Sequence, residues 1–508
     1  MCGIVGLVST TAANQQVYDA LALLQHRGQD STGIATCEGR VIHQRKAKGQ
    51  VREAFRTRDM RGLLGTMGLG HVRYATRGTA SNEEEAQPFY VNAPYGIILV
   101  HNGNLTNTRE LTDDLHLNDR RHLNTSSDTE LLVNVLAHEL QAATSVRAFS
   151  PDDVFDAVEV LHQRVEGSYA AIALIAGHGL LAFRDPFGIR PLVLGRRENA
   201  DNGAEWIVAS ESLVLEHGDY EIVREIAPGE AVFITEDGHM SSRQCAQNPQ
   251  LVPCSFEYVY LARPDSIMNG ISVYEARLRL GDRLADTIKK FVPLDQIDVV
   301  MPIPDSARPA AMQVARKLGV EYREGFYKNR YVGRTFIMPG QEARKKSVKQ
   351  KLNAMHSEFA GKNVLIVDDS IVRGTTSKEI VQMARDAGAR KVYMASAAPP
   401  VRFPNVYGID MPTPEELVAH NRSIEEVRQL IGCDALIYQD VDAMKQAVQS
   451  AAAPHAPKLD GFDASCFDGV YVTGDVSAQD IVRLNEKRVG QEEGEQDNSR
   501  LALPNSTE

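Results

Sequence analysis

The sequence predicts an α+β domain with antiparallel sheets, followed by an α/β domain built on a parallel sheet. Three observations support this prediction. The 508 residues are too many for one hydrophobic core, because single cores stop growing at about 250–300 residues. Short β-type segments separated by Gly, Asn and Pro turns dominate residues 1–235. After Phe256 the pattern changes to helical segments that alternate with apolar strands, as in βαβ units.

The amino-terminal half contains five segments with the composition of strands and two with helical spacing of apolar residues. The predicted strands are 3–8, 96–103, 169–177, 180–185 and 206–210, and the predicted helices are Val17–His26 and Ser127–Leu140. Residues 236–253 are expected to be a connector, because Asn, Gln and Pro are frequent there.

In the carboxyl-terminal half, predicted helices and strands alternate. The helices are 274–291, 307–319 and 377–389, and the strands are 297–304, 362–370 and 391–399. Such alternation implies a parallel sheet that binds ligands at the carboxyl ends of its strands. Residues 474–508 form a polar, acidic tail, expected to be helical or disordered.

Composition argues against several classes of function. The formal net charge of -12 disfavours a partner that is a nucleic acid or an anionic membrane. No signal peptide or membrane-spanning run is evident, so a cytoplasmic location is expected. The six cysteines include no C-x-x-C pair, and we expect most of them to be reduced and buried.

The most specific motif is VLIVDDSIVRGTTS, residues 364–377. An apolar strand delivers Asp368 and Asp369 together, and neighbouring carboxylates of this kind suit a cation or sugar hydroxyls. The loop that follows is rich in hydroxyls and Gly and leads into a helix, whose first turn has the capping pattern Thr376-x-x-Glu379. Backbone N–H groups at such a helix start bind phosphate. The motif therefore predicts a site for a ribose 5-phosphate, although two acids after a strand can also form an ordinary turn.

This motif resembles the phosphoribosyl diphosphate (PRPP) signature of type I phosphoribosyltransferases. MPIPDSARPAA, residues 301–311, matches the pyrophosphate loop of that family, and the basic segment 328–351 resembles its flexible loop. The resemblance implies one Mg²⁺ per subunit, bound with PRPP by Ser306, Asp368 and Asp369. The PRPP-binding residues that it implies are Asp305, Ser306, Lys328, Asp368, Asp369, Ser370, Arg373, Gly374, Thr375 and Thr376.

The amino terminus, MCGIVG, places a cysteine directly behind the initiator methionine. If Met1 is removed, Cys2 carries a thiol and an α-amino group, and the pKa of such an amine, near 8, lets it take the thiol proton. The thiolate can then attack an amide carbonyl. A cysteine that merely begins a buried strand is the ordinary alternative for MCG alone.

Four further motifs favour the catalytic interpretation. LQHRGQDSTGIA, GHVRYAT, HNGNLTN and SSDTELL follow in that order, and with CGIVG they resemble class II glutamine amidotransferase domains. The resemblance implies an N-terminal-nucleophile hydrolase sandwich with αββα layers. By the same resemblance Cys2 is the nucleophile, Asn102 and Gly103 form the oxyanion hole, and Arg73 and Asp128 bind glutamine.

A glutaminase joined to a PRPP-binding domain resembles the amidophosphoribosyltransferase family. The implied arrangement is a glutaminase domain at 2–240, a phosphoribosyltransferase domain at 254–473 and the tail at 474–508. The implied reaction converts PRPP, glutamine and water to 5-phosphoribosylamine, glutamate and pyrophosphate, the first committed step of purine synthesis, with ammonia passed internally. The resemblance also implies inhibition by AMP and GMP and a homo-oligomer, usually a tetramer.

Some members of that family hold an iron-sulfur cluster on four cysteines. Here Cys466 is alone in ASCFDGVY and Asn405 stands in RFPNVYGID, so no such cluster is expected. Two other functions compete with this interpretation. Another class II amidotransferase is disfavoured by the DD motif and by the absence of an ATP-pyrophosphatase glycine loop. A PRPP-sensing regulator should lack Cys2 and Arg73 and carry a basic face.

Overall fold

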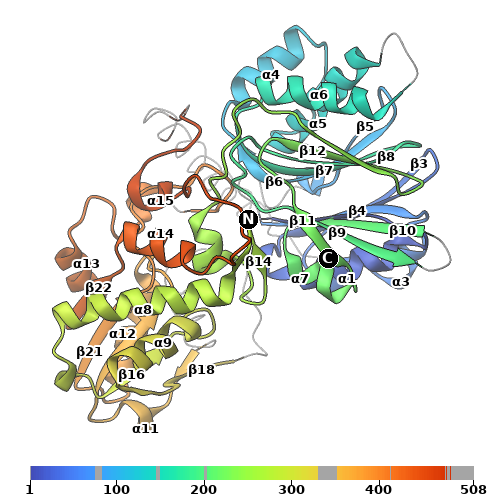
Figure 1. Cartoon of the computed structure of the whole chain (residues 1–508). Helices are drawn as coiled ribbons and strands as arrows, with labels where there is room; N and C mark the ends of the chain where they lie inside the picture. The colour runs from blue at the N-terminus through green and yellow to red at the C-terminus, as the bar shows by residue number, and fades with distance from the viewer. Residues whose placement is uncertain are drawn as a thin grey trace, which may run out of the picture.

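The computed structural model describes residues 2–74, 83–144, 149–199, 203–329, 352–411 and 413–474, together with residues 476 and 481. Two bodies lie side by side, one formed by the amino-terminal half and one by the carboxyl-terminal half (Figure 1). None of the helices in these ranges is long and apolar enough to span a membrane.

The amino-terminal body contains two sheets in which every pairing is antiparallel. The first has the order β11-β9-β10-β1-β4-β2-β3, and the second has the order β13-β12-β8-β7-β6-β5. The strands are β1 (Gly3–Val8), β2 (Ser31–Glu38), β3 (Val41–Lys48), β4 (Met67–Arg73), β5 (Phe89–Val91), β6 (Ile97–Leu105), β7 (Gly167–Ile175), β8 (Gly179–Arg184), β9 (Val193–Asn199), β10 (Gly203–Ala209), β11 (Glu221–Glu225), β12 (Glu230–Thr235) and β13 (Met240–Gln244).

The two sheets stack face to face between two layers of helices, which confirms the predicted αββα sandwich (Figure 1). Strand β1 illustrates why a strand in such a sandwich is apolar on both faces. Its side chains at Ile4 and Val8 join the core between the sheets, whereas Val5 and Leu7 pack against the helices on the outer face. A strand that is buried on both faces reads as a continuous apolar run. The helices of this body are α1 (Ala13–Leu23), α2 (Val51–Ala54), α3 (Thr57–Arg61), α4 (Thr108–Leu117), α5 (Asp128–Ala143), α6 (Pro151–Arg164) and α7 (Ser212–His217).

The carboxyl-terminal body is built on a five-stranded parallel sheet of order β17-β16-β20-β21-β22, as the alternating pattern predicts. Side chains of β20 alternate between its two faces: Leu365 and Val367 join one core, Val364 and Ile366 the other. Its strands are β16 (Val299–Pro302), β17 (Glu321–Tyr322), β20 (Asn363–Asp368), β21 (Lys391–Ser396) and β22 (Ala435–Tyr438), with short pairs β14 (Ile267–Met268), β15 (Ile271–Ser272) and β18 (Phe326–Lys328), β19 (Leu352–Ala354) beside it. Its helices are α8 (Val273–Phe291), α9 (Arg308–Leu318), α11 (His356–Phe359), α12 (Thr375–Asp386), α13 (Ile424–Ile431), α14 (Val441–Gln449) and α15 (Ser465–Asp468).

Two local predictions are wrong. The helix predicted at Val17–His26 begins earlier, at Ala13, and its last residues form a short 3-10 turn instead. Part of the predicted connector, Met240–Gln244, is the edge strand β13, paired with β12. Its sequence MSSRQ lacks a strong apolar alternation, because an edge strand can leave polar side chains in water on both faces.

Candidate active sites

Cys2 immediately precedes β1, which lies in the middle of the first sheet between β4 and β10. Its main-chain nitrogen donates a 3.2 Å hydrogen bond to Oδ1 of Asn102, which belongs to β6 of the second sheet. The thiol of Cys2 lies 3.7 Å from the carbonyl oxygen of Tyr74. The fold therefore brings the predicted nucleophile and a predicted oxyanion-hole residue together where the two sheets meet.

The side chain of Asn102 leaves one strong donor unused. Its Nδ2 is buried and has no hydrogen-bond partner among the described residues. Buried amide donors are rarely left unpaired unless they serve a function. The next residue, Gly103, has φ +147°, and a Cβ there would lie 2.0 Å from the carbonyl oxygen of Ser168, so only glycine fits. Asn102 Nδ2 can thus donate to an oxyanion formed beside Cys2.

Arg73 ends β4 and is almost completely buried. Its Nη2 lies 3.1 Å from Oε2 of Glu85, and the other carboxylate oxygen of Glu85 accepts a 3.1 Å hydrogen bond from Ser126. A buried guanidinium held by a carboxylate keeps a fixed orientation. The sequence motifs do not indicate Glu85, because nothing in the local pattern distinguishes it from its neighbours Glu83 and Glu84.

Asp128 is the first residue of α5 and is also buried. Its Oδ2 accepts a 3.1 Å hydrogen bond from the main-chain nitrogen of Leu105, the last residue of β6. Its Oδ1 lies 4.0 Å from Nδ1 of His101, and burial lowers the pKa of that histidine. The bond from Leu105 fixes Asp128 next to the strand that carries Asn102 and Gly103.

At the carboxyl end of β20 the second predicted cluster assembles. Ser306 donates a short hydrogen bond to Oδ2 of Asp369, and Ser370 donates a 2.7 Å hydrogen bond to Oδ1 of the same residue. The main-chain nitrogen of Asp369 donates a 2.9 Å hydrogen bond to Oδ1 of Asp368. The predicted proximity of Ser306 to the acidic pair is thereby observed, although the motifs lie 63 residues apart.

Burial, reinforced by the charge of Asp369, raises the pKa of Asp368 well above its usual range. Burial also raises the pKa of Asp369, although hydrogen bonds from Ser306 and Ser370 oppose the rise. A buried carboxylate, Asp369, next to a half-buried one, Asp368, is stabilised by a divalent cation or by hydroxyl donors. Among the described residues no group of three or more His, Cys, Asp or Glu side chains could hold a metal alone. A cation here would need further oxygen ligands, such as those of a bound diphosphate.

Asp305 and Lys328, both predicted to bind PRPP, form an ion pair with each other. Nζ of Lys328 lies 2.8 Å from Oδ2 of Asp305, and Nη1 of Arg308 lies 2.7 Å from Oδ1. These charges are half exposed, so both cations remain accessible to an anionic ligand. The remainder of the basic segment, residues 330–351, lies outside the described residues.

The loop from Ser370 to Gly374 ends differently from the prediction. Helix α12 begins at Thr375, and its N-cap is Gly374, at φ 73°, which makes no side-chain cap. The predicted cap at Thr376 is therefore wrong, because the left-handed glycine turns the chain into the helix earlier and places Thr376 inside the first turn. Arg373 pairs with Glu416 at 3.4 Å. The first-turn N–H groups of α12 remain suited to a phosphate.

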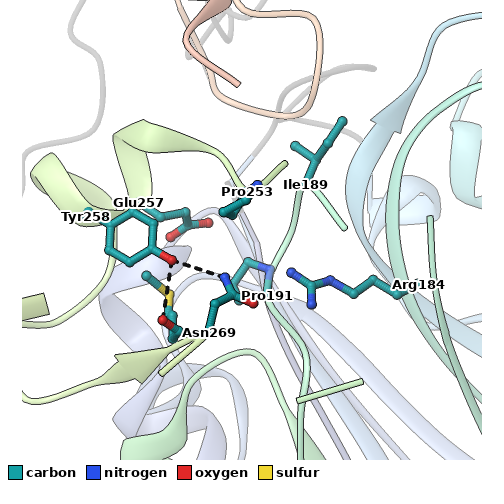
Figure 2. A pocket seen from close by; sticks show the side chains of 8 residues that line it. Arg184, Ile189, Pro191, Pro253, Glu257, Tyr258 and Asn269 are labelled. Atoms are coloured by element: carbon teal, nitrogen blue, oxygen red, sulfur yellow. Dashed lines mark hydrogen bonds between the residues drawn. The ribbon is translucent and has the colours of Figure 1, made fainter. Parts of the chain in front are cut away.

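A buried ion cluster joins the two bodies. The carboxylate of Glu257 accepts from Arg27 Nη2 at 2.9 Å and from Arg190 Nη1 at 3.3 Å, and all three side chains are almost fully buried. Figure 2 shows Glu257 and Tyr258 next to Arg184 and Asn269 at this junction. Asn269 donates a 3.0 Å hydrogen bond to the hydroxyl of Tyr258. No sequence motif indicates this ion cluster, because Arg27, Arg190 and Glu257 come from three distant segments.

Comparison with known proteins supports both halves. Residues 71–217 match the family model of the glutamine amidotransferase domain, and residues 274–399 match that of the phosphoribosyl transferase domain. The chain is 56% identical to the amidophosphoribosyltransferase of Pseudomonas aeruginosa, with 96% of each chain covered. It is 52% identical to that of Escherichia coli K12, with 98% of this chain and 99% of the relative covered.

A solved structure is similar over the same extent. The glutamine PRPP amidotransferase from B. subtilis, determined in complex with ADP and GMP, superimposes with a TM-score of 0.81 and is 36% identical. The similarity covers 94% of this chain and 98% of the B. subtilis chain.

Proposed function

The chain belongs to the amidophosphoribosyltransferase family, and from this premise we propose how its residues divide the work of the reaction. The enzyme converts PRPP, glutamine and water to 5-phosphoribosylamine, glutamate and pyrophosphate in purine synthesis. The observation that carries our assignment is the contact between Cys2 and Asn102, whose side-chain amide also holds a buried donor, Nδ2, with no partner among the described residues. We place the glutaminase domain at 2–240, the phosphoribosyltransferase domain at 254–473 and a tail at 474–508.

In the glutaminase site, Cys2 attacks the side-chain amide of glutamine after Met1 has been removed. Its α-amino group takes the thiol proton and later delivers it to the leaving ammonia. The oxyanion accepts hydrogen bonds from Nδ2 of Asn102 and from the main chain of Gly103. Arg73 binds the α-carboxylate of glutamine, and Asp128 accepts from its α-amino group. The buried positions of Arg73 and Asp128 support these roles, because both charges are held in fixed orientations.

In the synthase site, the loop Ser370–Thr376 binds the 5-phosphate of PRPP. Asp305, Ser306 and Lys328 contact the diphosphate, a role supported by the bond of Ser306 to Asp369 and by the ion pair between Lys328 and Asp305. Asp368, Asp369 and Ser306 would hold one Mg²⁺, for which the acidic pair and the adjacent hydroxyl are a suitable oxygen donor set. When bound, the ion would supply positive charge next to the departing pyrophosphate. No iron-sulfur cluster belongs to this proposal.

Ammonia passes between the two sites inside the protein. Released into water at neutral pH it would be protonated, and an ammonium ion has no lone pair for the anomeric carbon of PRPP. The contact between the two bodies buries the side chains of Arg27, Arg190 and Glu257 almost fully, which supports a route shielded from solvent.

Regulation, assembly and location follow from the family. The B. subtilis relative binds ADP and GMP, and we propose that purine nucleotides such as AMP and GMP inhibit this enzyme. A homotetramer in the cytoplasm is part of the same proposal, with neither nucleic acid nor membrane as a partner.

The test is an assay of PRPP-dependent pyrophosphate release, with glutamine or ammonia as the nitrogen source. The N-terminal mass is recorded on the same sample. Cys2→Ala should abolish synthesis from glutamine and leave synthesis from ammonia largely intact, because only the ammonia supply is removed. Cys245→Ala, a change at another buried thiol, is the matched control and should retain both activities. Equal loss of both activities in Cys2→Ala would contradict the two-site assignment.

A further inference from the structure

A turn of the phosphoribosyltransferase body, residues 405–408, lies directly behind the strand that carries Asn102 and Gly103. The side-chain amide of Asn104, in β6, donates a 2.9 Å hydrogen bond to the carbonyl oxygen of Val406. The hydroxyl of Ser168, in the neighbouring strand β7, donates to the carbonyl oxygen of Tyr407 at 3.3 Å. Both donors are buried. The turn is therefore bonded to two neighbouring strands of the second sheet, β6 and β7, close to Asn102 and Gly103.

The closest approach joins two glycines. Gly408 has φ +97°, and a Cβ there would lie 2.7 Å from the carbonyl oxygen, 2.8 Å from the carbonyl carbon and 3.0 Å from the Cα of Gly103. All three atoms belong to the main chain, which has no flexible end that could move aside. Gly408 thus packs main chain against main chain on one of the two proposed oxyanion-hole residues.

The turn is itself rigid. Oδ1 of Asn405 accepts hydrogen bonds from the main-chain nitrogens of Tyr407, at 2.9 Å, and Ile409, at 3.1 Å. The hydroxyl of Tyr407 is 2.7 Å from that of Thr473 and accepts from the Thr473 nitrogen at 3.1 Å. Because these hydrogen bonds within the carboxyl-terminal body fix the turn, its main chain can hold the adjacent strand β6 in position.

The chain beyond the turn is also anchored in the synthase body. The main-chain nitrogen of Val418 donates a 2.9 Å hydrogen bond to the carbonyl oxygen of Val372. The Cγ2 atom of Val418 would lie 2.7 Å from a Cβ placed at Gly374. The segment that follows the turn in the chain is therefore attached to the loop that ends at Gly374.

We propose that the turn 405–408 is a positioning element for the glutaminase oxyanion hole, so that the second domain completes the catalytic geometry of the first. The inference rests on the proposed roles of Asn102 and Gly103. Gly408 touches no reacting atom; it acts by fixing the main chain of Gly103. Misplacement of a catalytic group by about 1 Å can cost on the order of 100-fold in rate.

The test compares Gly408→Ala with Gly432→Ala. Gly432 has a similar φ of +84° but would place its Cβ in open space, so it reproduces the backbone strain without the contact. We expect Gly408→Ala to lower kcat of glutamine hydrolysis by about 10- to 100-fold, with KM for glutamine changed less than about threefold and ammonia-dependent synthesis retained. Gly432→Ala should retain both activities. The inference is wrong if the two variants lose the same glutaminase activity, or if ammonia-dependent synthesis falls in parallel.

A second pair of variants covers the case in which Gly408→Ala does not fold. Asn405→Ala removes both acceptor bonds inside the turn without adding atoms at the contact, whereas Asn405→Asp keeps an acceptor for both main-chain donors. Asn405→Ala should lower kcat for glutamine and Asn405→Asp should restore most of it. An equal loss in both would overturn the inference. The proposed function itself would fail if the wild-type protein hydrolysed no glutamine, or if Cys2→Ala still hydrolysed it. Both results concern proteins with an unchanged turn, so they are distinguishable from any result obtained with the turn variants.

Discussion

The main-chain nitrogen of Cys2 donates to Oδ1 of Asn102 across 3.2 Å, although the two residues are 100 positions apart and belong to different sheets. That bond fixes the orientation of the Asn102 amide, because one end accepts from Cys2 and the other end, Nδ2, must point away from it. The proposed nucleophile and the side chain proposed to donate to its oxyanion are thereby held in one arrangement.

Removing that donor should slow the chemistry more than it weakens binding. In Asn102→Ala we expect kcat for glutamine hydrolysis to fall by about 10²- to 10³-fold with little change in KM, since the oxyanion forms only after glutamine has bound. Steady-state kinetics of glutamate release measure both constants. Asn134→Ala is a suitable control, because the buried amide of Asn134 donates to the main-chain oxygen of Glu130 and has no proposed role in the reaction. A change confined to KM would argue against the oxyanion role.

Arg73 should affect glutamine binding. Truncation to Ala removes the guanidinium proposed to pair with the α-carboxylate of glutamine, and losing one partner of a buried charge pair between a protein and its ligand costs about 2–5 kcal/mol, or roughly 30- to 5000-fold in an equilibrium constant. We expect KM for glutamine to rise by at least about 30-fold in Arg73→Ala, and Arg73→Lys to recover only part of it because an ammonium lacks the two-pronged geometry. Ammonia-dependent synthesis measured on the same samples should be unaffected. A normal KM in Arg73→Ala would contradict the assignment.

The acidic pair should make the ligand-free protein less stable as pH rises. The pKa values of Asp368 and Asp369 are raised in the folded state, so the folded protein holds more protons than the unfolded chain above the unfolded value of about 4. Stability therefore falls as pH increases through that window. Asp368→Asn should raise Tm of the ligand-free protein at pH 7 and abolish synthesis from either nitrogen source. An unchanged rate of synthesis would refute the assigned role.

Mg²⁺ binding provides a second readout of the same site. With PRPP present, Mg²⁺ should raise Tm of the wild-type enzyme, and the increase should be lost in Asp369→Asn. Asp440→Asn, at an exposed helix cap, is the control and should keep the response. An equal Mg²⁺-dependent increase in Asp369→Asn would place the ion elsewhere.

Glu211 should make the folded protein less stable as pH falls, the opposite of the trend expected from the acidic pair Asp368 and Asp369. Burial alone would raise the pKa of its carboxyl, but the charge of Arg27 and a hydrogen bond from His26 outweigh burial and hold the pKa far below its usual range. The stabilisation is therefore present above the unfolded pKa near 4 and is lost as pH falls below it.

Replacing this carboxylate should be costly. Glu211→Ala leaves Arg27 short of one of its two buried carboxylate partners and removes the acceptor for Arg263 and Ser266 of the second body. Breaking a buried pair costs about 3–5 kcal/mol. We expect a fall in Tm of several degrees at pH 7, checked by calorimetry, and a much smaller effect of Glu425→Ala on the surface. A Tm equal to that of wild type would show that the junction gains nothing from this carboxylate.

Sequence reasoning reached the two catalytic clusters because their chemistry is concentrated in short motifs. Asp368, Asp369 and Ser370 are adjacent, and a buried strand followed by acids and hydroxyls has few other uses. The contact of Ser306 with Asp369 follows from the parallel sheet, which brings the ends of β16 and β20 to one edge. Cys2 was indicated only by its position in the chain and by its resemblance to known glutaminases.

The groups that sequence reasoning missed lie at long-range contacts. Glu85 is one of three consecutive glutamates, and only the fold distinguishes the one that meets Arg73. The pairing of Glu257 with Arg27 and Arg190 depends on how the two bodies dock, and no pattern within either body encodes it. The cap at Thr376 was misplaced because a left-handed glycine competes with a hydroxyl for the helix start.

The central position of β1 in the first sheet determines when that sheet can form during translation of the chain. Its neighbour β10 begins at Gly203, so the sheet cannot close around the amino terminus until about 200 residues have been made. At roughly 5–20 residues per second this takes about 10 to 40 seconds. Once the sheet closes, the main-chain nitrogen of Cys2 is buried and hydrogen-bonded to Asn102. The removal of Met1 that the proposed mechanism requires is therefore expected to be easier before this stage of translation than after it.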